Sequence, residues 1–184
     1  MIFEKDEVPN DFRKALIKPL YKKGDKSECR NYQGISQLSA GCKLLSSMIL
    51  FRLRDAVDKV LRKEQCSFRK ARGCVDQIFT FRLIIEVCLS CQTPLVLSFI
   101  YYKQTFDSVD RKSLTKVLTL YGLPDKYIKV ISSMYKNNTG AVKVGNEFSS
   151  WFCIKSGVQK SLALYPFIMI ILMNFNLRSP RKAM

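Results

Sequence analysis

The sequence contains no histidine, so a zinc site with the usual four ligands would have to be built from cysteines alone. Among its seven cysteines, only Cys88 and Cys91 have the two-residue gap that is typical of paired zinc ligands. We therefore expect free thiols, as in proteins of a reducing compartment. A zinc site made from scattered cysteines is the alternative.

Signals for secretion and for membrane insertion are also missing. The first six residues, Met-Ile-Phe-Glu-Lys-Asp, contain no apolar core of a signal peptide. The nearly apolar run over 162–175 is shorter than the roughly 20 residues that cross a bilayer. We therefore expect an intracellular protein with no membrane partner, in which this run forms a core helix. A membrane anchor is the alternative reading of the run.

Acidic residues are scarce and basic residues are abundant. The chain has 31 lysines and arginines against 15 aspartates and glutamates, which gives a net charge of +16 over its 184 residues. Residues 1–72 and residues 73–184 each carry +8, so we expect the charge on the folded surface and not in a tail. A hydrophobic content of 47% is that of a globular domain. A basic globular domain favours a polyanionic partner, most simply RNA or DNA.

The spacing of apolar residues predicts a mixed α/β domain. Pro19 favours an edge position for the first strand, residues 22–25 are expected to form a turn, and residues 31–36 a loop. Asp110 is placed to cap a following helix. Helices are predicted over 43–61, 74–87, 112–120, 125–135 and 162–175. Strands are predicted over 15–21 and 95–102, with a hairpin formed by 141–144 and 148–154.

Several stretches resemble the motifs of one family. Residues 99–111 read FIYYKQTFDSVDR and resemble a first palm motif of the form FIDFKKAFDSVDR. Residues 22–25, 31–36, 65–78 and 157–166 resemble, in turn, KKGD, NYRGIS, QAGFRxGRSxxDQI and GVRQGCPLSP. On these motifs the chain resembles the reverse transcriptases of non-LTR (LINE-type) retrotransposons. The resemblance implies an α/β fold that is a partial right-hand polymerase, with fingers over 1–92 and an incomplete palm over 93–184.

Departures from these motifs fall on the positions that carry catalysis. The resemblance implies that active relatives use two magnesium ions held by carboxylates, one from the first palm motif and two from a paired-aspartate box. The first position is Tyr101, whose neutral phenol is a poor magnesium ligand, and no paired-aspartate box occurs in residues 1–184. The second palm motif keeps Gly157, but its Gln-Gly pair is Lys160 and Ser161. We therefore expect no catalytic residue, no metal ligand and no cofactor in this chain.

Basic and aromatic positions of the motifs point to nucleic-acid binding. The resemblance implies that Lys22 and Lys23, together with the cluster Arg69, Lys70 and Arg72, face the template or the triphosphate. Guanidinium groups beside a helix start suit phosphate oxygens, although a solvated charged surface is the alternative. The resemblance also places Phe106 at the position of the nucleotide gate, with a core phenylalanine as the alternative.

Three functions are open from the sequence. The first is an inactive, truncated fragment of an RNA-directed DNA polymerase. The second is a repurposed module that binds RNA or single-stranded DNA weakly and without sequence preference. The third is a polymerase completed by another chain that supplies the missing carboxylates.

Overall fold

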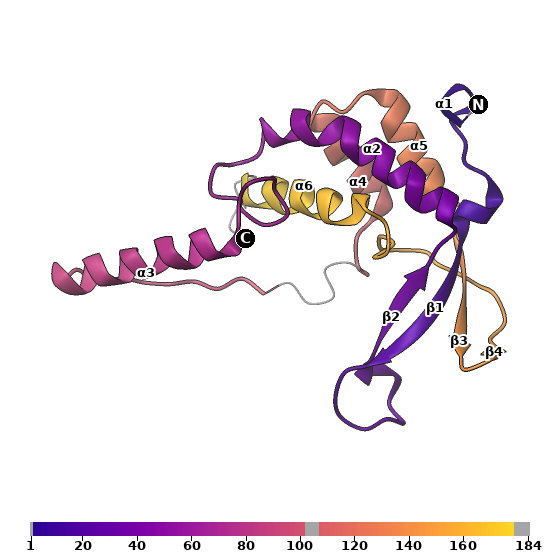
Figure 1. The fold of residues 1–184 in the computed structure, drawn as a ribbon, viewed down its shortest axis with the longest axis horizontal. Helices are drawn as coiled ribbons and strands as arrows, with labels where there is room; N and C mark the ends of the chain where they lie inside the picture. The colour runs from indigo at the N-terminus through magenta and orange to yellow at the C-terminus, as the bar shows by residue number, and fades with distance from the viewer. Residues whose placement is uncertain (1, 102–106, 179–184) are drawn as a thin grey trace, which may run out of the picture.

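The computed structural model describes residues 2–101 and 107–178, and the predicted mixed α/β class is confirmed (Figure 1). Two short 3-10 helices, Asn10–Arg13 and Cys29–Asn31, flank the first strand. The α-helices are α1 Ile2–Lys5, α2 Ala40–Asp58, α3 Cys74–Ser90, α4 Arg111–Leu120, α5 Asp125–Tyr135 and α6 Leu164–Arg178. The strands are β1 Lys14–Tyr21, β2 Tyr32–Gln37, β3 Thr139–Val144, β4 Glu147–Phe148 and β5 Phe152–Cys153.

One sheet joins the beginning of the chain to its second half. The strands lie in the order β2-β1-β3-β4, and β5 also pairs with β3. β1 runs antiparallel to β2 and parallel to β3, where Lys14 pairs with Thr139 and Ile17 pairs with Val142. The region expected to form fingers, 1–92, and the region expected to form the palm, 93–184, therefore share this sheet.

Two of the strand predictions were wrong. β1 is a central strand and not an edge, because it pairs with β2 on one side and with β3 on the other. The ladder with β3 covers only residues 14–17, so Pro19 lies beyond it. Pro19 therefore faces β2 alone, and its missing N–H breaks no ladder with β3. The loop expected over 31–36 is mostly strand β2. Position 34 of this strand favours glycine, because a Cβ there would lie only 2.8 Å from Cγ2 of Ile17.

Helices α2, α4, α5 and α6 form the core with the buried end of the sheet. Ile49, Leu118, Met134, Ile168 and Ile171 are among its fully buried side chains. Burial of each such side chain contributes roughly 1.5–3 kcal/mol. The predicted core helix over 162–175 is confirmed by α6, in which seven of 15 residues are buried, among them the continuous run 167–171. No helix in the described part of the chain is both long and apolar enough to span a membrane.

Three residues mark helix ends, and the cap that the sequence predicted at Asp110 is confirmed. Oδ2 of Asp110 accepts a hydrogen bond from the backbone N–H of Ser113 at 2.7 Å, which caps the first turn of α4. Gly122 has a φ of +72° just after α4, a backbone conformation that glycine adopts without strain. Pro124 lies immediately before α5, where its missing N–H removes no helical bond.

Helix α3 and residues 91–101 form an arm that projects from the rest of the protein (Figure 1). The strand predicted over 95–102 was wrong, because its described residues, 95–101, are extended without a pairing strand. A strand needs a neighbour for its backbone groups, and no described strand lies beside this segment. Its side chains are largely exposed, for example Val96 (89%) and Phe99 (84%). The Phe99 ring packs edge-on against Phe81 of α3, at a centroid distance of 6.4 Å.

Candidate functional site

Two motif-like segments meet beside the start of α4: the end of the first palm motif, residues 107–111, and the beginning of the second palm motif, residues 157–160, with Ser156 before it. The backbone N–H of Gly157 donates to the carbonyl of Val109 at 3.0 Å, and Oγ of Ser156 donates to the carbonyl of Asp107 at 3.1 Å. Nζ of Lys160 lies 3.0 Å from Oδ2 of Asp107 in an ion pair. The Lys160 side chain is only 18% exposed, so this contact fixes the second segment against the first.

Arg111, the first residue of α4, stabilises the same junction through hydrogen bonds of its side chain. Its guanidinium donates to the carbonyls of Tyr135 (2.7 Å), Ile154 (2.9 Å), Gly157 (3.2 Å) and Ser156 (3.3 Å). The group also lies 5.4 Å from the centroid of the Tyr135 ring. Burial lowers the pKa of Arg111 from its ordinary value, although an arginine remains charged under any physiological condition. Sequence reasoning missed this role, because four carbonyl acceptors from distant residues leave no sequence signal.

A cleft of about 360 Å³ opens between the sheet and this junction. Gln159, in its wall, is only 5% exposed, and neither atom of its side-chain amide has a hydrogen-bond partner among the described residues. Buried amides are nearly always paired, so this one is available to a group that both donates and accepts. The lining residues are Ile17, Gly34, Ser36, Asp107, Arg111, Phe152, Ile154, Ser156, Gly157, Val158, Gln159 and Lys160.

The other predicted positions of the palm-like motifs are Tyr101, Phe106 and Ser161. Tyr101 is 91% exposed and is the last described residue of the arm. Phe106, the expected nucleotide gate, lies outside the described residues. Ser161 has a buried Oγ with no partner among the described residues. Among the predicted positions that the structure describes, only Gly157 and Lys160 line the cleft.

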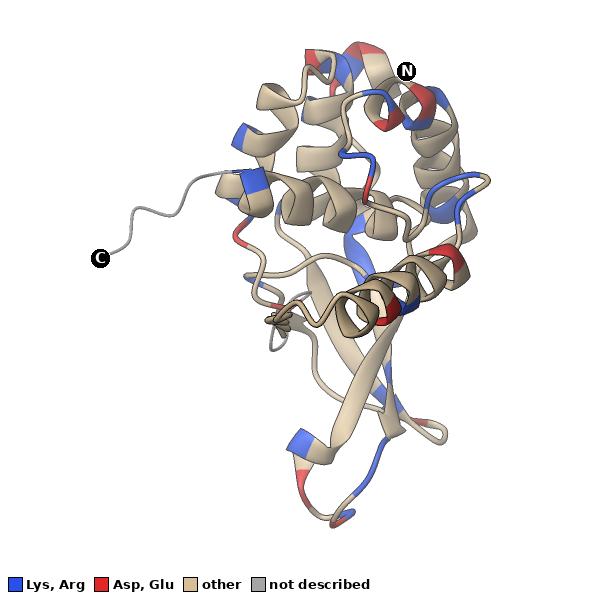
Figure 2. Cartoon of the chain, turned by 90° about the vertical axis from the view of Figure 1, so that its left-hand side faces the viewer, with Lys and Arg blue, Asp and Glu red and all other residues tan. Residues whose placement is uncertain are grey.

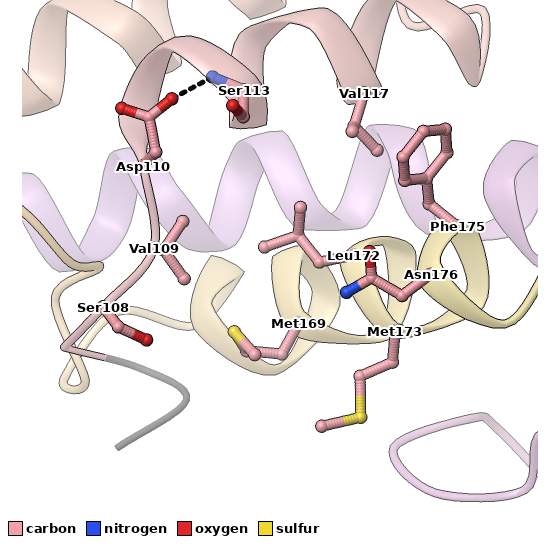
Figure 3. A pocket seen from close by; sticks show the side chains of 10 residues that line it. All are labelled: Ser108, Val109, Asp110, Ser113, Val117, Met169, Leu172, Met173, Phe175 and Asn176. Atoms are coloured by element: carbon pink, nitrogen blue, oxygen red, sulfur yellow. Dashed lines mark hydrogen bonds between the residues drawn. The ribbon is translucent and has the colours of Figure 1, made fainter. Parts of the chain in front are cut away.

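A second, apolar groove of about 280 Å³ lies between the start of α4 and α6 (Figure 3). Met169, Leu172 and Met173 of α6 face Val109 and Val117 across it. Asp110 is its only acidic residue, and the carboxylate already caps Ser113. Such a lining offers no cation for phosphate, so we do not assign nucleotide binding to this groove.

Arg69, one of the cations predicted to contact phosphate, is held by contacts within the protein. Its side chain is 5% exposed and forms a fork with the Asp58 carboxylate, at 2.6 Å to Oδ1 and 2.9 Å to Oδ2. Three further bonds go to the carbonyls of Asp58 (3.1 Å), Arg62 (2.8 Å) and Gln65 (3.0 Å). These bonds use all five N–H groups of a guanidinium. Hydrogen bonding from Arg69 lowers the pKa of the Asp58 carboxyl.

The other predicted phosphate ligands remain on the surface. Lys22 and Lys23 are exposed in the turn between β1 and β2, which Gly24 completes with a φ of +94°. Lys70 and Arg72 are exposed just before α3, and Arg72 donates a hydrogen bond to the carbonyl of Lys63. Figure 1 shows these two segments on different parts of the molecule. The predicted cations therefore do not gather at one site.

Basic residues are distributed over the whole fold. Figure 2 shows lysine and arginine positions on helices, strands and turns alike, with fewer acidic positions between them. This agrees with the expectation that the net charge of +16 sits on the folded surface. The electrostatic field therefore acts over the surface as a whole.

Residues 21–184 match the family described as "Reverse transcriptase (RNA-dependent DNA polymerase)". The chain belongs to this family, its resemblance to the reverse transcriptases of non-LTR retrotransposons is confirmed, and its fold is that of a partial right-hand polymerase. It is 27% identical over 180 residues to "Transposon TX1 uncharacterized 149 kDa protein" of Xenopus laevis, covering 92% of this chain and 14% of that protein. It is also 27% identical over 187 residues to "Probable RNA-directed DNA polymerase from transposon BS" of Drosophila melanogaster, covering 96% of this chain and 20% of that protein. The chain thus spans a fifth or less of the length of these two relatives.

The residues present do not fit the magnesium ions that this family implies. Magnesium prefers carboxylate oxygens, and the first of the expected positions carries the phenol of Tyr101. Asp107, nearby in sequence, already pairs with the Lys160 ammonium. Within residues 2–101 and 107–178, no group of three or more His, Cys, Asp or Glu side chains is placed to hold a metal ion. All seven cysteines are free thiols, as expected.

Proposed function

We propose that this chain binds RNA or single-stranded DNA weakly and without sequence preference, and that it has no polymerase activity of its own. The observation that carries the second part is Tyr101 at the first carboxylate position. Nucleotide addition in this family requires carboxylates to hold two metal ions that stabilise the attacking and leaving oxygens. A phenol that is neutral at pH 7 does not replace one of them.

Membership in the family and the charge of the surface support the first part of the proposal. Four of the predicted cations are exposed: Lys22, Lys23, Lys70 and Arg72. None of them takes part in an ion pair within residues 2–101 and 107–178, so each can contact phosphate without breaking one. Contacts of this kind read the phosphate backbone and carry no sequence information. They release counterions, so affinity should fall with salt at a log–log slope of about −0.7 per neutralised phosphate of a single strand.

Primer extension tests the catalytic part of the proposal. The purified chain would be incubated with a primed RNA template and labelled nucleotides, with magnesium or manganese, beside a known reverse transcriptase as positive control. We expect no extension by the unmodified chain and none by Tyr101→Asp, because one restored carboxylate does not supply the other two. Reproducible template-dependent extension by the unmodified chain would refute the inactive assignment.

Fluorescence anisotropy of a labelled single-stranded oligonucleotide tests the binding part over a range of salt concentrations. The variant Lys22→Ala/Lys23→Ala/Lys70→Ala/Arg72→Ala should give a flatter salt slope than the unmodified chain. A matched control removes four exposed lysines of the helical part instead: Lys43, Lys112, Lys116 and Lys126. Equal slopes for the two variants would show that the four predicted cations have no special part in binding.

A further inference from the structure

Three lysines lie on one face of the sheet. Side chains alternate between the faces of a strand, so Lys14 and Lys18 of β1 share the face of Leu16, which pairs with Ala141 of β3. Lys143, two residues after Ala141, lies on the same face next to Lys18. This arrangement is confirmed by a hollow of about 270 Å³ that is lined by Lys18, Gln37, Lys143 and Gly145.

Two exposed aromatic rings accompany these lysines. Trp151 is 52% exposed and Phe148 is 57% exposed. Nζ of Lys14 lies 5.8 Å from the centroid of the Trp151 ring, and Nζ of Lys143 lies 5.2 Å from that of Phe148. Phe148 also pairs directly with Lys143 across β3 and β4, which places both side chains on one face. What distinguishes these two rings from single exposed apolar residues is that each has a lysine ammonium beside it.

The charge of this face is not neutralised by acidic neighbours. Glu147 is the only acidic residue in the five strands, and it pairs with Val144, whose side chain alternates to the opposite face from Lys143. None of the ion pairs in the described residues involves Lys14, Lys18 or Lys143. The sheet projects away from the helices (Figure 1), and Lys14 and Lys18 are exposed on this face.

We propose that this sheet face binds single-stranded nucleic acid by stacking bases on Trp151 and Phe148 while Lys18 and Lys143 contact the phosphates. The proposal rests on the proposed function and adds to it the surface that meets the bases. Aromatic rings beside cations on an open sheet are the common means by which proteins hold single strands without reading sequence. Bases in a duplex are already stacked and paired, so this face should prefer a single strand to a duplex.

Intrinsic fluorescence gives a direct test, because Trp151 is the only tryptophan in the chain. The full chain would be titrated with oligothymidylate and, separately, with a duplex, while anisotropy of a labelled oligonucleotide measures binding independently. We expect the single strand to quench Trp151 emission in parallel with the anisotropy, and the duplex to quench it much less. Truncation of one ring, Phe148→Leu, should weaken single-strand binding by roughly 5- to 100-fold.

A charge-matched comparison separates the face from general electrostatics. Lys18→Ala/Lys143→Ala should weaken binding more than Lys116→Ala/Lys126→Ala, which removes the same charge from exposed positions on α4 and α5. Circular dichroism checks that each variant folds. All four lysines are surface residues, so we expect folding to be unaffected.

The outcomes distinguish this inference from the proposed function. If anisotropy reports binding while Trp151 emission stays constant, the proposal that the sheet face binds the single strand is refuted. The proposed function would not be affected by this result. Equal quenching by duplex and single strand would overturn the stacking. A complete absence of binding in the anisotropy assay would refute the proposed function, and the sheet face with it.

Discussion

Replacing Arg69 with alanine should destabilise the whole domain by loosening the loop between α2 and α3. Breaking a buried ion pair costs about 3–5 kcal/mol when the remaining charge stays buried. Here the Arg69 side chain is 5% exposed but that of Asp58 is 44% exposed, so water can solvate the carboxylate that is left. We therefore expect a loss of about 2 kcal/mol, discounted from the buried range for this solvent access. For a domain of this size that corresponds to a fall in Tm of roughly 4–8 °C.

Thermal unfolding followed by circular dichroism measures this effect at pH 7. Arg69→Lys should recover only part of the loss, because an ammonium cannot reproduce the planar fork that reaches Asp58 and three carbonyls. Arg72→Ala is the matched control, since Arg72 is exposed and donates a single described bond, to Lys63. A change at such a surface position is expected to stay within about 0.5 kcal/mol.

The same prediction has a pH dependence with a definite sign. The Asp58 pKa is lowered in the folded protein, chiefly by the hydrogen bond from Arg69. The stability that this pair contributes is therefore present above the ordinary carboxyl pKa of 3.8 and is lost as the pH falls through the lower folded value. The difference in Tm between the unmodified chain and Arg69→Ala should become smaller in strong acid, and the part that remains comes from the three bonds of Arg69 to backbone carbonyls. Equal Tm values at pH 7, or a gap that persists unchanged in strong acid, would refute the structural role of Arg69.

Three further outcomes are expected. The exposed apolar arm, residues 74–101, should cause self-association of the isolated chain in size-exclusion chromatography with light scattering; a monodisperse monomer that melts cooperatively would contradict this. Asp110→Ala should lower the Tm by removing the cap on Ser113, and Asp110→Asn should restore most of it. Burial raises the pKa of the Cys42 thiol to about 11, so native alkylation at pH 8 should spare Cys42 in peptide mass spectra, and labelling of Cys42 before unfolding would contradict this. The exposed thiols that should react are Cys29, Cys74, Cys91 and Cys153.

The helices could be predicted from the sequence because their signals are local. The apolar spacing that predicted helix over 43–61 corresponds to α2, which runs from Ala40 to Asp58, and the predicted cap Asp110 marks the start of α4. A helix forms its hydrogen bonds within four residues, so its own sequence contains most of the information. The hairpin of β3 and β4 is equally local and was predicted, but its second strand, expected over 148–154, is two short strands, β4 and β5.

Contacts between distant residues could not be predicted in this way. The parallel pairing of β1 with β3 leaves no trace in either strand, so a proline on β1 was misread as a mark of an edge. The basic cluster around Arg69 shows charge but not the acid that faces it, and Asp58 lies on the helix before. The segment 95–101 has the composition of a buried strand, but strand formation depends on neighbours that its own sequence does not specify.

The parallel pairing of β1 with β3 sets the order in which the chain can fold. Lys14 pairs with Thr139, so this pair cannot form until the ribosome has added 125 further residues. At ordinary rates of synthesis this takes roughly 6–25 s. β1 and β2 can form their hairpin early, but one side of β1 then remains an open edge. Open edges recruit other strands, and high contact order slows their closure. During synthesis, one side of β1 therefore stays unpaired, and able to recruit other strands, until β3 has been made.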